Sequence, residues 1–275
     1  MTFGATSLTV RFGDVTALDD VTVKVEPGVV VAVVGGDGAG KSTLLRSMVR
    51  EVQPDKGQVE APGKAEIGFL PASAGSWASL SVKQNLDFAG GVFGLTGDAL
   101  TGRRDELIAS AGLTGAADRL ASQLSGGMRR KLGFCMAIIS RPTLLVLDEP
   151  STGVDPVSRI DLWRLISEAA AEGTAVLMST TYLDEAERAG HLLVLDHGGV
   201  LVQGTYDDVR RGFDGVITTG PIAARPEWSW RRGRNRHELW LDGDPPPKHL
   251  ATVDPDLEDI VIALSLVRRQ TAAAS

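Results

Sequence analysis

A glycine-rich run between an apolar segment and a predicted helix limits the folds open to this chain more than any other feature. Residues 29–34 are all apolar, as in a strand that is buried on both faces of a sheet. Residues 43–49 read as the start of a helix. The run between them is Gly35-Gly36-Asp37-Gly38-Ala39-Gly40-Lys41-Ser42-Thr43. Its glycines let the backbone curl so that N–H groups converge on an anion, which predicts a phosphate-binding loop.

Two side chains of this loop carry chemistry. Lys41 is expected to reach the β- and γ-phosphates of a nucleotide, and the hydroxyl of Ser42 to ligate Mg²⁺. The alternative is a flexible turn with an exposed lysine, which the strand before the loop and the helix after it disfavour. We therefore expect residues 35–43 to hold a nucleotide.

A second motif is an apolar strand, residues 144–147, that ends in Asp148 and Glu149. An acid at the carboxyl end of a parallel strand, beside a phosphate loop, can hold the Mg²⁺ that bridges the phosphates. We assign this role to Asp148, in part through water. Glu149 is expected to act as the general base that polarises the attacking water. The alternative is a pair of acids that cap the next helix.

A third motif is Leu124-Ser125-Gly126-Gly127-Met128, followed by basic residues and an apolar helix. Ser125 is well placed as an N-cap, and the glycines expose backbone N–H groups, which makes a second anion site. Since the chain already has a phosphate loop, the second site suggests a nucleotide held between two subunits. The alternative is an ordinary cap with a basic, solvated first turn.

The order of elements predicts the fold class. Strands alternate with helices around the phosphate loop, which indicates an α/β fold with a mainly parallel sheet. Alternation in residues 8–12 and 21–25 predicts an antiparallel β subdomain. Helical residues at about 73–141 form an inserted subdomain, with glycine breaks expected at 90–91 and 94–102. We expect an ATPase-type domain over residues 1–212.

Residues 213–275 differ in composition and predict a small β-rich appendage that ends in a helix at about 257–269. Tryptophans and arginines at 228–240 have two interpretations. They could form a surface for nucleic acid, or a hairpin around residues 232–235 with buried tryptophans and solvated arginines. The hairpin is favoured because the formal net charge of the 275-residue chain is −7, which argues against nucleic acid as a partner.

Bulk properties predict a cytoplasmic protein. The chain is 43% hydrophobic, and it shows neither an apolar run long enough to cross a bilayer nor the features of a signal peptide. Its single cysteine, Cys135, lies in an apolar stretch and is expected to be a buried hydrophobe rather than a nucleophile.

The three motifs, in this order and spacing, resemble the ATP-binding cassette (ABC) ATPases over residues 5–212. The resemblance implies a head-to-tail dimer of nucleotide domains, with each ATP between the phosphate loop of one subunit and the Ser125, Gly126 and Gly127 of the other. It also implies that Phe12 stacks on adenine, although an alternating strand could bury this ring in the core instead. Asp155 matches the acid of a loop that communicates across the dimer. Residues 154–159 resemble those of drug and lipid exporters.

Two positions depart from the family. Ala72 stands where the family has a glutamine that contacts Mg²⁺ and the attacking water, and Thr181 stands where it has a histidine that contacts the γ-phosphate. We expect a site that binds ATP and Mg²⁺ well and hydrolyses ATP slowly. This favours a heterodimer with a second nucleotide-binding domain that has a working site, while a homodimer stays open.

The resemblance implies an exporter subunit that powers a separate multi-span permease from the inner face of the cell membrane. Trp77 is expected to be exposed for contact with that permease, and the alternative is a core tryptophan. Two other functions stay open. One is a soluble ABC ATPase that acts on ribosomes or DNA, and the other is an ATP-binding regulatory subunit that does not hydrolyse.

Overall fold

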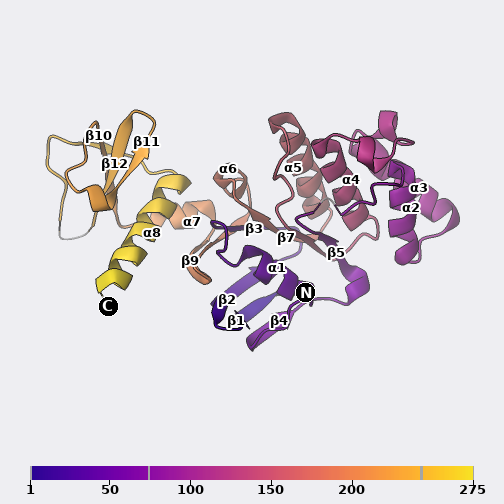
Figure 1. Ribbon diagram of the computed structural model, residues 1–275, viewed down its shortest axis with the longest axis horizontal. Helices are drawn as coiled ribbons and strands as arrows, with labels where there is room; N and C mark the ends of the chain where they lie inside the picture. Colours follow the sequence, from indigo (N-terminus) through magenta and orange to yellow (C-terminus); the bar gives the residue numbers. More distant parts are fainter. Residues whose placement is uncertain (1, 74, 242–243, 275) are drawn as a thin grey trace.

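A six-stranded sheet forms the centre of the molecule in the computed structural model, which describes residues 2–73, 75–241 and 244–274 (Figure 1). Its strand order is β5-β6-β7-β3-β8-β9. Every neighbouring pair is parallel except β8 and β9, which confirms the predicted mainly parallel sheet. The strands are β3 (Val30–Val34), β5 (Ile67–Leu70), β6 (Leu144–Leu147), β7 (Ala175–Thr180), β8 (His191–Asp196) and β9 (Gly199–Gly204).

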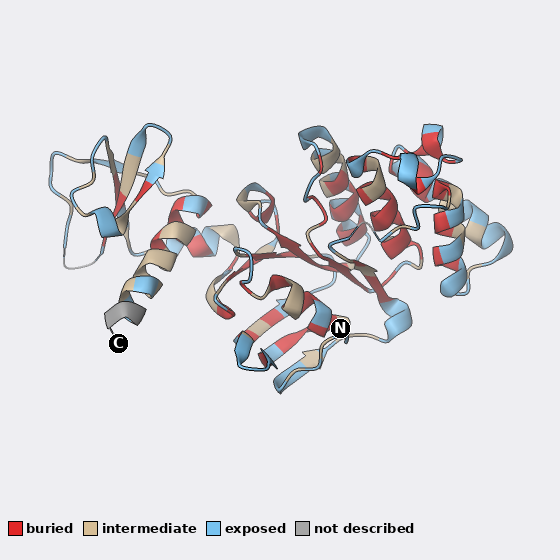
Figure 2. Cartoon of the chain, in the orientation of Figure 1, coloured by how far each residue is buried: buried red, intermediate tan, exposed pale blue. Residues whose placement is uncertain are grey.

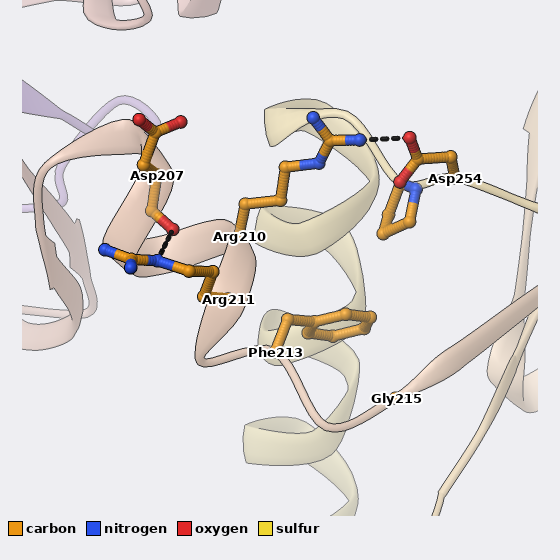
Figure 3. A pocket seen from close by; sticks show the side chains of 7 residues that line it. Asp207, Arg210, Arg211, Phe213, Gly215 and Asp254 are labelled. Atoms are coloured by element: carbon orange, nitrogen blue, oxygen red, sulfur yellow. Dashed lines mark hydrogen bonds and ion pairs between the residues drawn. The ribbon is translucent and has the colours of Figure 1, made fainter.

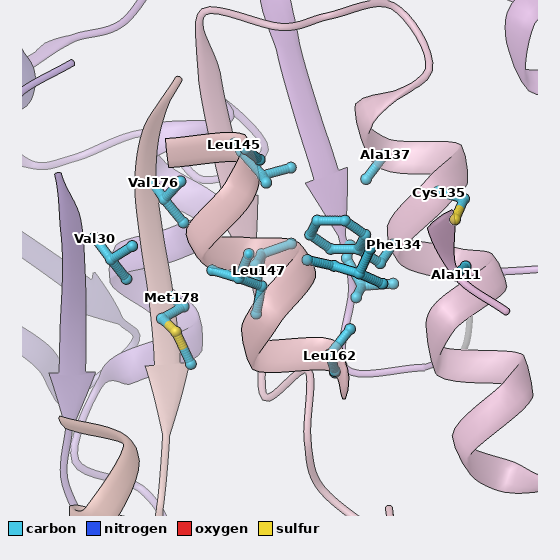
Figure 4. Packing of buried hydrophobic residues seen from close by; sticks show 14 of the residues in the cluster. Val30, Ala111, Phe134, Cys135, Ala137, Leu145, Leu147, Leu162, Val176 and Met178 are labelled. Atoms are coloured by element: carbon cyan, nitrogen blue, oxygen red, sulfur yellow. The ribbon is translucent and has the colours of Figure 1, made fainter. Parts of the chain in front are cut away.

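The central strands are buried on both faces, and alternate residues point into two different cores. Val30, Ala32 and Val34 belong to one hydrophobic cluster, and Val31 and Val33 to the other. This explains why the strand sequence is apolar at every position. Figure 4 shows part of the first core, where Phe134 packs beside Leu145 and Leu147.

The second core lies between the sheet and the N-terminal part of the chain. A three-stranded antiparallel sheet, ordered β2-β1-β4, packs there with helix α1 (Lys41–Met48). Its strands are β1 (Phe3–Phe12), β2 (Val15–Val25) and β4 (Lys56–Glu60). The predicted antiparallel β subdomain is confirmed.

The first core includes helices that lie between β5 and β6 in the sequence. They are α2 (Val82–Val92), α3 (Gly97–Ser110) and α4 (Gly126–Ile138), with the short 3₁₀ turns η2 (Thr114–Ala116) and η3 (Ala121–Gln123) between α3 and α4. A further 3₁₀ turn, η1 (Lys64–Glu66), precedes β5. The predicted break at residues 90–91 is wrong, because α2 continues through both glycines. A Cβ atom at Gly90 would lie 2.4 Å from Leu100 Cδ1, so the glycine there serves close packing.

Three further helices follow β6. They are α5 (Pro156–Ala171), α6 (Leu183–Ala186) and α7 (Tyr206–Arg211). Asp155 is the N-cap of α5: its carboxylate accepts a hydrogen bond from the Ser158 N–H at 3.0 Å. Hydrogen bonds from the Ser158 side chain and backbone hold the pKa of Asp155 below its usual range. No helix in residues 2–73, 75–241 and 244–274 is long and apolar enough to cross a membrane.

The C-terminal appendage contains an antiparallel sheet of order β11-β12-β10-β13 and helix α8 (Leu257–Ala274). The hairpin predicted at residues 232–235 is confirmed, with Trp230 buried and Arg231 exposed. Figure 2 shows the chain coloured by burial, with buried segments concentrated in the central sheet and the helices that pack on it. The domain boundary at residue 212 stays a prediction. The remaining elements are β10 (Val216–Gly220), η4 (Pro226–Trp228), β11 (Ser229–Arg232), β12 (Asn235–Trp240) and β13 (Ala251–Val253).

Candidate nucleotide site

The glycine-rich run forms a tight loop between β3 and the first turn of α1. Gly40 has a φ of 104°, and a Cβ atom there would lie 2.6 Å from the Ala17 carbonyl oxygen, so only glycine fits. Helix α1 begins at Lys41, directly after this residue. Its first N–H groups and the positive end of its dipole therefore face the loop, which favours an anion bound there.

Lys41 is held across the mouth of this loop. Its side chain is only 5% exposed, and Nζ donates hydrogen bonds to the carbonyl oxygens of Gly35 at 2.7 Å and Gly36 at 3.2 Å. The same ammonium lies 3.6 Å from Glu149 Oε1. Its position places the ammonium group of Lys41 beside Glu149, the predicted general base.

A hollow of about 330 Å³ opens over the loop. Phe12 lines it at the end of β1 and is 55% exposed, which is incompatible with the core-packing alternative for this ring. An exposed aromatic face beside a phosphate loop suits a nucleotide base. The complete lining is Phe12, Ala17, Gly36, Asp37, Gly38, Ala39, Gly40, Lys41, Ser42, Thr43 and Glu149.

Asp148 follows β6, which is separated from β3 by β7 alone, so it lies at the same edge of the sheet as the loop. Its Oδ1 accepts hydrogen bonds from Ser42 Oγ at 3.0 Å and from Ser179 Oγ at 2.8 Å. Its Oδ2 is buried and has no hydrogen-bond partner among the described residues. An orphaned carboxylate oxygen next to the Ser42 hydroxyl fits a divalent cation or its bound water.

Glu149 differs from Asp148 in that its carboxylate reaches the hollow. Its backbone has a φ of 48°, a left-handed conformation that is unusual for a residue with a side chain. The Glu149 N–H donates to Ser179 Oγ at 2.8 Å, and Thr152 Oγ1 donates to Glu149 Oε2 at 3.1 Å. These contacts hold the carboxylate toward Lys41, where a general base for water would act.

The third motif lies elsewhere on the surface. Ser125 is confirmed as the N-cap of α4, since its Oγ accepts a hydrogen bond from the Met128 N–H at 3.2 Å. A Cβ atom at Gly127 would lie 2.6 Å from Ser158 Oγ, so α4 and α5 meet there at their N-termini. Ser125 and Gly126 are exposed and are not among the described residues that line the hollow. One chain therefore brings together the first two motifs but leaves the third apart.

Arg130 of α4 connects the region after β5 to the backbone of Glu149. The side chain donates to the carbonyl oxygens of Pro71 at 3.0 Å, Ser73 at 2.9 Å and Ala72 at 2.5 Å. It also donates to the Glu149 carbonyl oxygen at 3.1 Å. Burial lowers the pKa of this guanidinium, and the nearby Asp148 and Glu149 carboxylates oppose that shift. The backbone of residues 71–73 is thus hydrogen-bonded to α4, although Ala72 has no polar side chain.

Glu185 forms a second buried network, on the other side of Glu149. Its carboxylate accepts hydrogen bonds from Ser151 Oγ at 2.9 Å and Thr180 Oγ1 at 2.6 Å. Arg159 Nε donates to the same carboxylate at 3.3 Å. Thr181 follows Thr180 directly and is exposed. The network therefore connects the loop after Glu149 to the end of β7, directly before Thr181.

Three residues that support the site, Ser179, Arg130 and Glu185, have no role predicted from the sequence. Ser179 could have been found by register, because Leu147 pairs with Met178 and the next residues, Asp148 and Ser179, must adjoin. Arg130 and Glu185 left no comparable signal, since both are charged residues on helices whose partners are distant in sequence.

Two further predictions concern single side chains. Trp77 is 45% exposed, as expected, and its ring meets Phe88 edge-on with a centroid distance of 4.3 Å. Cys135 is fully buried, and desolvation raises the pKa of its thiol to about 12, which agrees with a hydrophobic role.

A second hollow, of about 580 Å³, lies where α7 approaches the start of α8 (Figure 3). Arg210 there pairs with Asp254, and Arg211 Nε donates to the Asp207 carbonyl oxygen at 3.2 Å. Both arginines already have partners in the chain, and Figure 3 shows no convergent set of polar groups comparable to that around Lys41. We therefore favour the phosphate loop over this hollow as the candidate functional site.

Comparisons with known proteins point to one family. The family model described as ABC transporter matches residues 18–152. The daunorubicin resistance ATP-binding protein DrrA3 of Streptomyces coeruleorubidus is 36% identical over 211 residues, which cover 73% of this chain and 67% of that protein. The probable multidrug ABC transporter ATP-binding protein YbhF of Escherichia coli is 37% identical over 201 residues, 70% of this chain and 35% of YbhF. The match thus spans about a third of one relative and two thirds of the other.

A solved structure of an ATP-binding subunit of an ABC transporter superposes with a TM-score of 0.71 at 28% identity. The match covers 78% of this chain and 93% of that one. The predicted phosphate-loop α/β core is therefore confirmed by a structural relative as well as by the observed sheet order.

Proposed function

Since this chain belongs to the family of ATP-binding cassette (ABC) transporter ATPases, we propose that it holds Mg²⁺-ATP at the phosphate loop and powers a separate membrane permease. The observation that carries this proposal is that Lys41 and Glu149 line one hollow, and that Asp148 accepts a hydrogen bond from Ser42, which lines the same hollow. A cation for phosphate, a ligand for a divalent metal and a base for water are the groups that ATP hydrolysis requires.

The nucleotide is oriented by groups that the fold has already positioned. The loop N–H groups and Lys41 bind the phosphates, and the exposed ring of Phe12 stacks on the base. Ser42 and Asp148 would hold Mg²⁺, and the unpartnered Asp148 Oδ2 is the observation that fits them to it. Bound there, Mg²⁺ would neutralise charge on the phosphates.

Glu149 performs the proton transfer in this proposal. The oxygen of a water molecule attacks the γ-phosphorus, its proton passes to the Glu149 carboxylate, and the bond to the ADP oxygen breaks. Lys41, 3.6 Å from Glu149 Oε1, stabilises the negative charge that develops on the transferred group.

The second anion site completes the nucleotide site of another subunit. Ser125 and Gly126 are exposed and are not among the described residues that line the chain's own hollow, so they are available to an ATP held by a partner. Gly127 follows them in the first turn of α4. We propose a head-to-tail dimer of nucleotide domains. A heterodimer is favoured, because Ala72 and Thr181 leave this chain's own site without two contacts to the γ-phosphate and water.

Export across the cell membrane is the transport process we propose. The names of two relatives refer to multidrug transport and daunorubicin resistance. The exposed pair Trp77 and Phe88 is the proposed contact with a multi-span permease, which would hold the chain at the cytoplasmic face of the membrane. The permease would select the transported compound.

The test is a single-turnover ATPase assay on the purified chain with Mg²⁺, alone and with a candidate second cassette. We expect tight ATP binding and slow hydrolysis alone, and faster turnover in the mixture. K41A is expected to abolish binding, whereas E149Q is expected to retain binding and lose hydrolysis. Rates typical of an ordinary cassette from the chain alone would contradict the weakened site, and failure to bind ATP would contradict the function itself.

A further inference from the structure

Helix α8 of the appendage is built into two hydrophobic cores. Leu257 and Ile260 are fully buried in the core that covers the central sheet, whereas Ala263 is buried against the appendage sheet. Figure 1 shows α8 between the appendage strands and the region of α7 and β9. These contacts fix α8, including its later turns, relative to the nucleotide-binding part of the chain.

Arg268, in the second half of α8, lies on the turn that joins β8 to β9. Its Nη1 donates a hydrogen bond to the Asp196 carbonyl oxygen at 2.9 Å. A Cβ atom at Gly199 would lie 2.6 Å from Arg268 Nη2, so the guanidinium rests directly on the backbone of the turn. Both strand ends at the turn are thereby in contact with one side chain.

The turn itself is short and conformationally defined. Asp196 pairs with Gly199, which leaves two residues, His197 and Gly198, with φ values of 47° and 81°. Two consecutive positive φ values are the signature of the tight hairpin turn that matches the twist of the strands. A contact at one side of such a turn is transmitted to the other side because the turn has little freedom to deform.

The other side of the turn touches the phosphate loop. The Gly198 N–H donates to the Ala39 carbonyl oxygen at 3.2 Å, and the Asp19 N–H donates to the Gly198 carbonyl oxygen at 2.9 Å. The Leu195 carbonyl oxygen would lie 2.5 Å from a Cβ atom at Gly35. The loop that binds phosphate is thus supported from behind by the segment that Arg268 holds.

We propose that Arg268 is a positioning residue for ATP binding, through which the C-terminal appendage sets the affinity of the phosphate loop. The inference rests on ATP binding at that loop, as proposed above. An anion site made of backbone N–H groups binds well only when those groups are oriented in advance. Without Arg268 the turn and the loop gain freedom, and part of the binding free energy is lost in ordering them again.

The binding experiment titrates the whole chain with a fluorescent ATP analogue and Mg²⁺. R268A is expected to weaken binding by about three- to tenfold, as for the loss of a charged hydrogen bond that acts through the loop. R268K retains a donor for the Asp196 carbonyl and is expected to recover part of the affinity. The matched control is R269A, because Arg269 is the next residue of the same helix and is exposed; its affinity should stay within about twofold of the wild type.

Hydrogen exchange without nucleotide tests the same contact independently of ATP. R268A is expected to accelerate exchange at residues 36–40 and 195–199, while the appendage strands β10 and β12 exchange as in the wild type. Equal affinity and equal exchange in R268A and R269A would overturn the proposal. Faster exchange throughout β10 and β12 would also overturn it, since the loss would then come from unfolding of the appendage. A wild-type chain that binds no ATP would contradict the proposed function, and exchange alone would then decide on Arg268.

Discussion

The guanidinium of Arg130 donates a hydrogen bond to the carbonyl oxygen of Glu149, 3.1 Å away. Arg130 lies one helical turn beyond Ser125 and Gly126, the exposed residues of the third motif, and Glu149 is the proposed general base. The same guanidinium holds the carbonyls of residues 71–73. In the proposed dimer, a partner's nucleotide at the start of α4 would be connected through the Arg130 side chain to the backbone of the proposed general base.

Removal of the Arg130 side chain should destabilise the protein. R130A leaves the carbonyl groups of residues 71–73 and Glu149 without this charged donor, and we expect a loss of about 3 kcal/mol in the free energy of unfolding. Urea denaturation monitored by circular dichroism measures it. R130K keeps one charged donor and should lose less. Equal stability of R130A and the wild type would contradict the role assigned to these hydrogen bonds.

Restoring the missing γ-phosphate contact should raise hydrolysis. T181H supplies a donor that can carry positive charge, and we expect single-turnover hydrolysis to rise about tenfold or more with little change in ATP affinity. T181A is the control, and its rate should match the wild type because the threonine hydroxyl contributes little. A large drop in T181A would show that Thr181 already performs the function of the histidine.

Ser179 should control the use of Mg²⁺. Its hydroxyl donates to Asp148 Oδ1 and accepts from the Glu149 N–H, so S179A releases both acids of the second motif. We expect the Mg²⁺ concentration for half-maximal ATP binding to rise about tenfold, as for other supports of metal ligands. The exposed Ser73 provides the control S73A. An unchanged Mg²⁺ dependence in S179A would remove Ser179 from the site.

Cys135 should be unreactive in the folded protein. Burial raises the pKa of its thiol to about 12, so the reactive thiolate is scarce at pH 8.5 although an ordinary cysteine would be half ionised there. Alkylation by iodoacetamide should be about 100-fold slower in the native protein than in urea. Mass spectrometry of the labelled protein measures both rates. Rapid native labelling would indicate that the α4 core opens easily.

Local sequence was sufficient for most of the fold. Residues 30–34 and 144–147 are short apolar runs. The first is followed by a glycine-rich loop and the second by two acids, so the type and place of both strands could be predicted. Gly90 shows where this reasoning fails, because glycine breaks a helix by propensity unless a neighbouring side chain needs the space. Only the packing of Leu100 reveals that need.

Local sequence predicted the ligand-binding groups of the site, because the phosphate loop, the two acids and the helix cap each depend on neighbours in the chain. It also showed the replacements at Ala72 and Thr181. The residues that support those groups were found from the packing alone: Ser179 contacts two acids, Arg130 contacts Glu149, and Arg268 contacts the turn behind Gly35 and Ala39. These contacts join residues far apart in sequence, and their geometry depends on how sheets and helices pack, which no local pattern encodes.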